Sequence, residues 1–218
     1  MFRIYRKLVK GEQILAATDT AGGGGDFTAT QFLSATKLDV PIVYHSDATT
    51  SSYVPVHCRA LETIYTHTGV KPVTAFERNN GGNFLMDRVA ALNIAGHFDV
   101  FRMPRIGQGD SGESMLLGWN TNTATRPKML SELQDAINGQ VFTIYDRQTV
   151  KEMLSFIKVK TATAFKAQAE RKSHDDLVMA LAIAWQMYQL HALRPKQEVQ
   201  KDYSKYEKYQ QEDPYGVR

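Results

Sequence analysis

Four acidic side chains in this sequence have positions that suit metal-dependent chemistry. Asp175 and Asp176 open a long apolar run, so that two adjacent carboxylates stand at the start of a buried helix. At a separation of ~4 Å and an effective dielectric constant of about 20, their repulsion is on the order of 4 kcal/mol. A shared proton or a bound cation would relieve it. Asp19 and Glu77 each end an apolar, strand-like segment, and carboxylates that converge form an oxygen site suited to Mg²⁺ or Mn²⁺.

Each acid also has an ordinary structural explanation. Asp19 could bond its own backbone in a turn, and Glu77 could pair with Arg78 or face solvent. The pair at 175–176 could offset the dipole of a helix capped by Ser173. That effect is worth about 0.3–1 kcal/mol, which is too small to account for two carboxylates in succession.

Hydrophobic patterning predicts the elements that must position these acids. A basic, amphipathic lead-in or linker remnant covers 1–13, and a Gly-rich turn at 21–25 joins the first two strands as a hairpin. Strands are predicted at 14–20, 27–35, 40–45, 73–77, 100–103 and 141–145, with Pro41 suiting a sheet edge. Helices are predicted at 53–68, 83–95, 127–138, 147–156 and 175–193. A polar loop is expected at 107–112 and a hairpin or extended arm at 157–167.

This order predicts an α/β protein with a mixed sheet flanked by helices. The first three strands would be antiparallel, and right-handed crossovers would add the later, parallel strands. The pattern gives one domain over residues 1–195 and a flexible, charged, Tyr-rich tail over 196–218.

Composition sets broad limits on the class of protein. The chain has 218 residues, 43% of them hydrophobic, and a formal net charge of +3, which neither requires nor excludes nucleic acid. Cys58 is the single cysteine, which excludes an internal disulfide and a zinc framework. With no membrane-length apolar stretch and no apolar signal core near Met1, we expect a soluble intracellular protein without a membrane partner.

Three motifs in order resemble a known family. They are Asp19 followed by the Gly-rich turn, Glu77 followed by Arg-Asn-Asn-Gly-Gly, and the His-Asp-Asp-Leu-Val start of the last helix; Leu117–Asn122 and Arg126–Lys128 add to the likeness. The sequence from 14 to 193 is similar to the nuclease domain of the large terminase subunit of tailed bacteriophages, within the ribonuclease H-like superfamily. Each motif alone is weak, and their order makes the match more specific.

The resemblance implies a metal-dependent endonuclease that cuts concatemeric viral DNA during packaging. Asp19, Glu77 and Asp176 would be the catalytic ligands of two Mg²⁺ or Mn²⁺ ions about 3.5–4 Å apart, with Asp19 bridging them. Asp175 competes with Asp176 as the direct ligand, or binds the second ion. His174 and Asp26 would support the site, although a His at a helix start is more often a surface or capping residue.

The resemblance also implies partners. They are double-stranded DNA, an ATPase domain of the same full-length protein, the small terminase subunit and the portal, all in the host cytoplasm. No Gly-x-x-x-x-Gly-Lys-Ser/Thr phosphate loop occurs in this sequence, so we expect no motor activity from it.

Basic residues near the predicted acids suit a DNA backbone. They are Lys158, Lys160, Lys166, Arg171, Lys172 and, more weakly, Arg78, Arg102 and Arg105. An edge strand guarded by lysines explains the first of these equally well. Alternative functions are another ribonuclease H-like nuclease (a junction resolvase or hybrid nuclease) or a non-catalytic DNA clamp or portal-docking module. An actin-like sugar kinase or ATPase would need two duplicated halves, for which the chain is too short.

Overall fold

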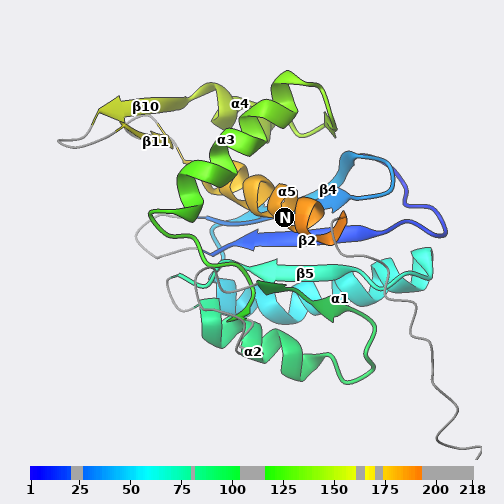
Figure 1. Cartoon of the computed structure of the whole chain (residues 1–218). Helices are drawn as coiled ribbons and strands as arrows, with labels where there is room; N and C mark the ends of the chain where they lie inside the picture. The colour runs from blue at the N-terminus through cyan, green and yellow to red at the C-terminus, as the bar shows by residue number, and fades with distance from the viewer. Residues whose placement is uncertain (21–26, 80–81, 104–115, 161–164, 170–173, 193–218) are drawn as a thin grey trace, which may run out of the picture.

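The fold is a mixed β-sheet with helices on both faces (Figure 1). The computed structural model describes residues 1–20, 27–79, 82–103, 116–160, 165–169 and 174–192. The predicted Gly-rich turn, the loop at 107–112 and the tail at 196–218 therefore lie outside the described residues. In the described part, the main sheet has seven strands in the order β1-β4-β3-β2-β5-β6, with β9 beside β4.

Three strands form the antiparallel half of this sheet, as predicted. They are β2 (Ile14–Asp19), β3 (Thr28–Ser34) and β4 (Asp39–Ser46). β4 is not an edge strand, because β1 (Phe2–Ile4) and β9 (Thr143–Ile144) share its outer side. Pro41 lies between those two pairings and beside a register shift in the β3–β4 ladder, where a missing N–H group is tolerated.

The parallel half extends from the other side of β2. β5 (Val73–Phe76) pairs in parallel with β2, and β6 (Asp99–Val100) pairs in parallel with β5. α1 (Thr50–Thr68) and α2 (Gly82–Leu92) connect these strands and cover one face of the sheet (Figure 1). The predicted strand at 100–103 is divided, because β7 (Arg102–Met103) leaves the main sheet to pair with β8 (Leu116–Leu117).

The second face is covered by α5 (Asp176–Ala192), which lies directly on the sheet under α3 (Thr125–Asn138) and α4 (Arg147–Leu154) (Figure 1). All residues of α5 from Leu177 to Met187 are buried. An apolar helix of this kind needs cover all round, and the sheet and α3 supply it. The helix predicted at 175–193 from its long apolar run is thus confirmed.

Strand alternation divides the core between these two layers. Leu15 and Ala17 of β2 pack with α5, whereas Ile14 and Ala16 pack with α1. Successive side chains of a strand point to opposite faces, so one strand serves both layers. Position 19 falls on the α5 face by the same alternation.

The N-terminal segment is not a linker, contrary to the prediction for 1–13. β1 pairs with β4, and the Arg6 guanidinium contacts the carboxylates of Glu12 and Asp39. Buried acids of this kind need a fixed cationic partner, and Arg6 supplies it. The ion cluster therefore attaches this segment to the sheet.

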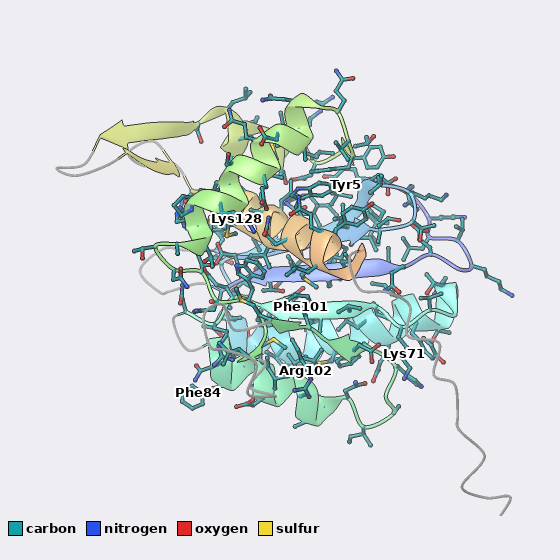
Figure 2. The ribbon with its side chains drawn as sticks, in the orientation of Figure 1. Tyr5, Lys71, Phe84, Phe101, Arg102 and Lys128 are labelled. Atoms are coloured by element: carbon teal, nitrogen blue, oxygen red, sulfur yellow. The ribbon has the colours of Figure 1, made fainter. Side chains whose placement is uncertain are left out.

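The helix predicted at 83–95 ends earlier, at Leu92, and two large apolar side chains near it are exposed. Ile94 lies beyond the end of α2 and is 92% exposed. Phe84 points outward from α2 in Figure 2 and is 74% exposed.

The arm predicted at 157–167 is an antiparallel hairpin. β10 (Phe156–Lys160) pairs with β11 (Phe165–Ala169), and the hairpin extends away from the sheet beside α3 and α4 (Figure 1). No helix in the described residues is both long and apolar enough to span a bilayer.

Candidate active site

The register between β2 and β5 brings Asp19 and Glu77 side by side. Thr18 is paired with Phe76, and the Glu77 N–H donates to the Thr18 carbonyl at 2.8 Å. Glu77 is the next residue after β5 and forms a bridge with Trp119. Parallel strands end at the same edge, and the pleat turns both residues to the face that carries α5.

α5 brings the third acid to the same edge. The helix begins at Asp176, at the end of the sheet toward which the β2 and β5 arrows point in Figure 1. Asp176 is buried, and its charge acts on the Asp19 carboxyl group. Three segments that are far apart in sequence therefore converge on one point.

The electrostatics at Asp19 follow from this convergence. Burial raises the pKa of the Asp19 carboxyl well above its ordinary value, and the charge of Glu77, hydrogen bonding with Glu77 and the charges of Asp176 and Asp175 raise it further. All of these neighbours are acidic. A carboxyl group in such surroundings either keeps a proton or needs a cation.

Asp175 has a different environment from Asp176. Its carboxylate accepts a hydrogen bond from Arg126 Nη2 at 2.8 Å, and its side chain is 30% exposed. Asp176 also acts more strongly than Asp175 on Asp19. Asp176 is therefore the member of the pair with the larger effect on the Asp19 carboxyl, whereas Asp175 has an arginine partner.

His174 lies next to the acids on the solvent side. Its Nδ1 atom is 3.7 Å from Asp176 Oδ2, and its side chain is 46% exposed. Its imidazole ring packs edge-to-face with the Phe27 ring, with the ring centroids 4.9 Å apart. His174 thus lies at the exposed margin of the acidic cluster.

The segment from 117 to 126 contacts the site, and the sequence motifs gave it no chemical role. Asn79 Nδ2 donates to Glu77 Oε1 at 3.2 Å and to the Thr121 carbonyl at 2.9 Å, which connects Glu77 to this segment. Trp119 Nε1 and Thr121 Oγ1 are buried and have no hydrogen-bond partner among the described residues. Such atoms beside an acidic site are candidates for contact with a bound ligand.

Glu152 and Gln31 are further residues that sequence reasoning missed. Glu152 Oε2 accepts from the Leu177 N–H at 2.9 Å, and Gln31 Nε2 donates to the Leu177 carbonyl at 3.1 Å. Burial raises the pKa of the Glu152 carboxyl to about 7, and the charge of Asp176 contributes to this shift. Both residues lie in amphipathic or alternating segments where nothing in the sequence marks them as unusual.

Most of the residues predicted to contact DNA have side chains that are not described. Arg78 donates to the Leu117 carbonyl at 2.7 Å, so that its guanidinium stabilises the backbone beside β5. Lys158, Lys160 and Lys166 belong to the β10–β11 hairpin, whose side chains are not described. The other predicted residues that lie outside the described residues are Asp26, Arg105, Arg171 and Lys172.

A divalent cation fits the chemistry of these donors. Within the described ranges, no three or more His, Cys, Asp or Glu side chains are already arranged as a metal site. However, the largest influences on the Asp19 carboxyl, apart from burial, are all carboxyl groups. Hard carboxylate oxygens of this kind are the donors that Mg²⁺ and Mn²⁺ prefer.

The fold is similar to those of several solved nuclease domains. The Thermus phage P74-26 large terminase nuclease domain is 17% identical over 86% of this chain and 84% of its own, with a TM-score of 0.56. The large terminase nuclease of thermophilic phage G20c, solved with bound magnesium, is 15% identical over 84% of both chains, with a TM-score of 0.60. The human cytomegalovirus terminase nuclease domain, soaked with Mn, is 10% identical over 83% of this chain and 86% of its own, with a TM-score of 0.54.

Sequence comparison alone does not reach this result. No protein-family model and no curated protein matches the sequence. At these low identities the likeness is one of fold, and it confirms the fold that the family resemblance implies. The chain therefore has the ribonuclease H-like fold of the nuclease domains of large terminases.

Proposed function

We propose that this chain is a metal-dependent DNA endonuclease that cuts concatemeric viral DNA during genome packaging. The observation that carries the proposal is the convergence of Asp19, Glu77 and Asp176 at one edge of the sheet. Structural acids are normally paired with cationic groups, as Glu12 and Asp39 are with Arg6. Carboxyl groups gathered against their own repulsion favour a site that binds cations.

The side chains divide the work in this proposal. Asp19, Glu77 and Asp176 hold two divalent ions, which when bound polarise the scissile phosphate and activate water for phosphodiester hydrolysis. Asn79 orients Glu77 through its 3.2 Å hydrogen bond. Arg126 donates a hydrogen bond to the Asp175 carboxylate at 2.8 Å, and its positive charge partly neutralises that carboxylate at the start of α5.

The proposed partners follow from the same function. Double-stranded DNA is the substrate, and its phosphates are contacted without base readout by the basic residues around the β10–β11 hairpin. An ATPase domain of the same protein, the small terminase subunit and the portal complete the proposed machinery in the host cytoplasm. A junction resolvase or hybrid nuclease would use the same carboxylates on another substrate. A portal-docking role could coexist with cutting.

The test is cleavage of plasmid DNA by the purified chain. We expect nicking or cutting with Mg²⁺ or Mn²⁺ and none in EDTA, and faster cleavage of duplex DNA than of four-way junctions or RNA–DNA hybrids. Failure to cut any of these with either metal would contradict the nuclease assignment. Preference for a junction or a hybrid would instead support the alternative nucleases.

Asp19→Asn is the matching variant. It removes a ligand and a buried carboxyl that its acidic neighbours disfavour, so we expect cutting to disappear while the melting temperature in EDTA stays equal or rises. A gain of about 1 kcal/mol would raise the melting temperature of a domain of this size by roughly 2–4 °C. The control is Asp87→Asn on the exposed side of α2, which should change neither property. Cutting by Asp19→Asn at the wild-type rate would remove Asp19 from the site.

A further inference from the structure

A residue from another helix, Glu152 of α4, accepts a hydrogen bond from the first turn of α5. The Asp175 carbonyl accepts from the Met179 N–H at 2.8 Å, which makes Asp175 the N-cap residue of α5. An Asp at this position ordinarily accepts hydrogen bonds from the two N–H groups that follow the first helical residue. Here Glu152 of α4 accepts from the Leu177 N–H at 2.9 Å, and the Asp175 carboxylate accepts from Arg126 instead.

The carbonyl group of Leu177 is also held by a hydrogen bond. Gln31 Nε2 donates to the Leu177 carbonyl at 3.1 Å and to Thr149 Oγ1 at 2.9 Å. The Thr149 hydroxyl in turn donates a hydrogen bond to Asp146 Oδ2 at 2.7 Å. Glu152, Gln31 and Thr149 are all buried, so this chain of hydrogen bonds connects β3, α4 and α5 inside the molecule.

Stability alone does not explain why Glu152 occupies this position. An N-cap contributes about 0.5–2 kcal/mol, whereas burying a carboxylate costs several kcal/mol. Glu152 is 4% exposed, and its Oε1 atom has no hydrogen-bond partner in the described residues. Asp175 could provide the same cap from a half-exposed position without that penalty.

We propose that Glu152, with Gln31, is a positioning residue for the metal-binding carboxylates. By accepting from the first-turn amides of α5, Glu152 removes the partners that would draw the Asp175 carboxylate back onto its own helix. Contacts to both the N–H and the carbonyl of Leu177 fix the backbone immediately after Asp176. The direction of the Asp176 carboxylate is thereby set before a cation binds, and this inference rests on the proposed function.

The experiment measures Mn²⁺ binding by calorimetry and by electron paramagnetic resonance, without DNA. Glu152→Leu keeps the volume but removes the acceptor. We expect it to fold with equal or greater stability, because an apolar replacement avoids burying a charge, and to bind Mn²⁺ 10- to 100-fold more weakly, the usual loss when a residue supporting a ligand is removed. Glu152→Gln keeps an acceptor oxygen and should restore binding to within a few-fold of wild type.

A matched control separates positioning from general damage. Glu12 is also a buried acid that accepts from a backbone N–H, that of Val9 at 2.9 Å, but it precedes β2 at the opposite end from Asp19. Glu12→Ala should lose stability and keep its Mn²⁺ affinity. If Glu152→Leu does not fold, Gln31→Met removes the opposing contact with little change in volume and should weaken Mn²⁺ binding in the same direction.

The outcomes can be told apart. Wild-type Mn²⁺ affinity in Glu152→Leu, or in Gln31→Met where the first variant fails to fold, overturns the positioning role and leaves the nuclease proposal intact. Equal losses in Glu152→Leu and Glu12→Ala also overturn it, because they would trace the effect to folding. Absence of Mn²⁺ binding by the wild-type chain overturns the proposed function itself, and the positioning role with it.

Discussion

At the scale of single residues, His57 shows how this core treats an ionisable group outside the site. It is fully buried, with Nδ1 bonded to the Tyr53 hydroxyl at 3.0 Å and Nε2 to Thr74 Oγ1 at 2.8 Å. The aromatic rings of Phe32 and Phe76 also contact it. Burial without an acidic partner lowers the pKa of His57 from 6.5 to about 3.

This lowered pKa makes the fold sensitive to acid. Between pH 6.5 and about 3, His57 is protonated in the unfolded chain and neutral in the folded chain. The free energy of unfolding therefore falls as the pH falls through this window. The loss from one group is at most about 1.4 kcal/mol per pH unit. His57→Gln should be less stable than wild type at pH 7, and that difference should shrink as the pH is lowered toward 5, measured by urea unfolding.

Tyr53→Phe provides the control for this prediction. It removes the hydroxyl that bonds His57 Nδ1 but leaves the imidazole in place. The variant should be destabilised and yet lose stability with falling pH as steeply as wild type. A constant difference between His57→Gln and wild type from pH 7 to pH 5 would show that this histidine does not carry the acid sensitivity.

At the scale of elements, patterning was sufficient for long segments rich in apolar residues. The segments at 27–35 and 175–193 predict β3 and α5, and both elements are buried over almost their whole described length. The placement of Asp19 and Glu77 at strand ends was predicted for the same reason. The register that brings them together could be assumed only from the family resemblance, since it depends on pairing between distant strands.

Long-range polar contacts were not predictable in this way. Glu152 and Gln31 have no local sequence mark, because their partners lie on other elements. The strand pairing of Phe2–Ile4 was missed because three residues carry too little pattern, and the Arg6 ion cluster depends on Asp39 from another strand. The pairing of Arg126 with Asp175 was hidden for the same reason.

Gly118 gives an element-scale prediction, because it lets the segment before Trp119 approach β5. Its φ is +81°, and a Cβ atom there would lie 2.6 Å from the Phe76 carbonyl oxygen and 2.9 Å from Met86 Cγ. Gly118→Ala must therefore displace the backbone next to Glu77. Gly69 at the end of α1 is a matched control, with φ of +71° and nothing within 4 Å of its Cβ position.

Both alanine variants carry the same conformational cost, about 1–2 kcal/mol for a left-handed residue. Only Gly118→Ala adds steric overlap, which typically costs a further 1–3 kcal/mol or so in a packed core. Urea unfolding should therefore show a larger loss for Gly118→Ala than for Gly69→Ala. Similar losses at the two positions would mean that the segment moves away from β5 without cost.

At the scale of the whole molecule, the clustered acidic residues and the β10–β11 hairpin lie at the same end of the fold (Figure 1). The chain passes from α4 through the β10–β11 hairpin and then into α5, whose first residue is Asp176. The hairpin extends from the body at the end where α5 begins (Figure 1). If the acidic edge binds cations as proposed, a basic hairpin near it would hold the phosphate backbone on which the edge acts.

The register of the hairpin sharpens the test of this idea. Lys158 is opposite Ala167, Lys160 is opposite Phe165, and Lys166 is opposite Val159. In strand alternation Lys158 and Lys160 therefore occupy one set of positions, and Lys166 belongs to the other. Substituting both Lys158 and Lys160 removes the lysines at one set of alternate positions and leaves Lys166 unchanged.

Lys158→Ala combined with Lys160→Ala should reduce the salt dependence of DNA binding. Each phosphate contact contributes about 0.9 to the slope of log K against log salt, so the loss of two contacts lowers its magnitude by up to about 1.8. The measurement is a titration of a labelled duplex in EDTA, which prevents metal-dependent cutting. Lys10→Ala with Lys37→Ala removes the same charge from exposed positions at the opposite end of β2 and β3, and should leave the slope almost unchanged. Equal slopes for the hairpin variant and wild type would show that DNA does not contact these lysines, and equal reductions in both variants would assign the effect to net charge.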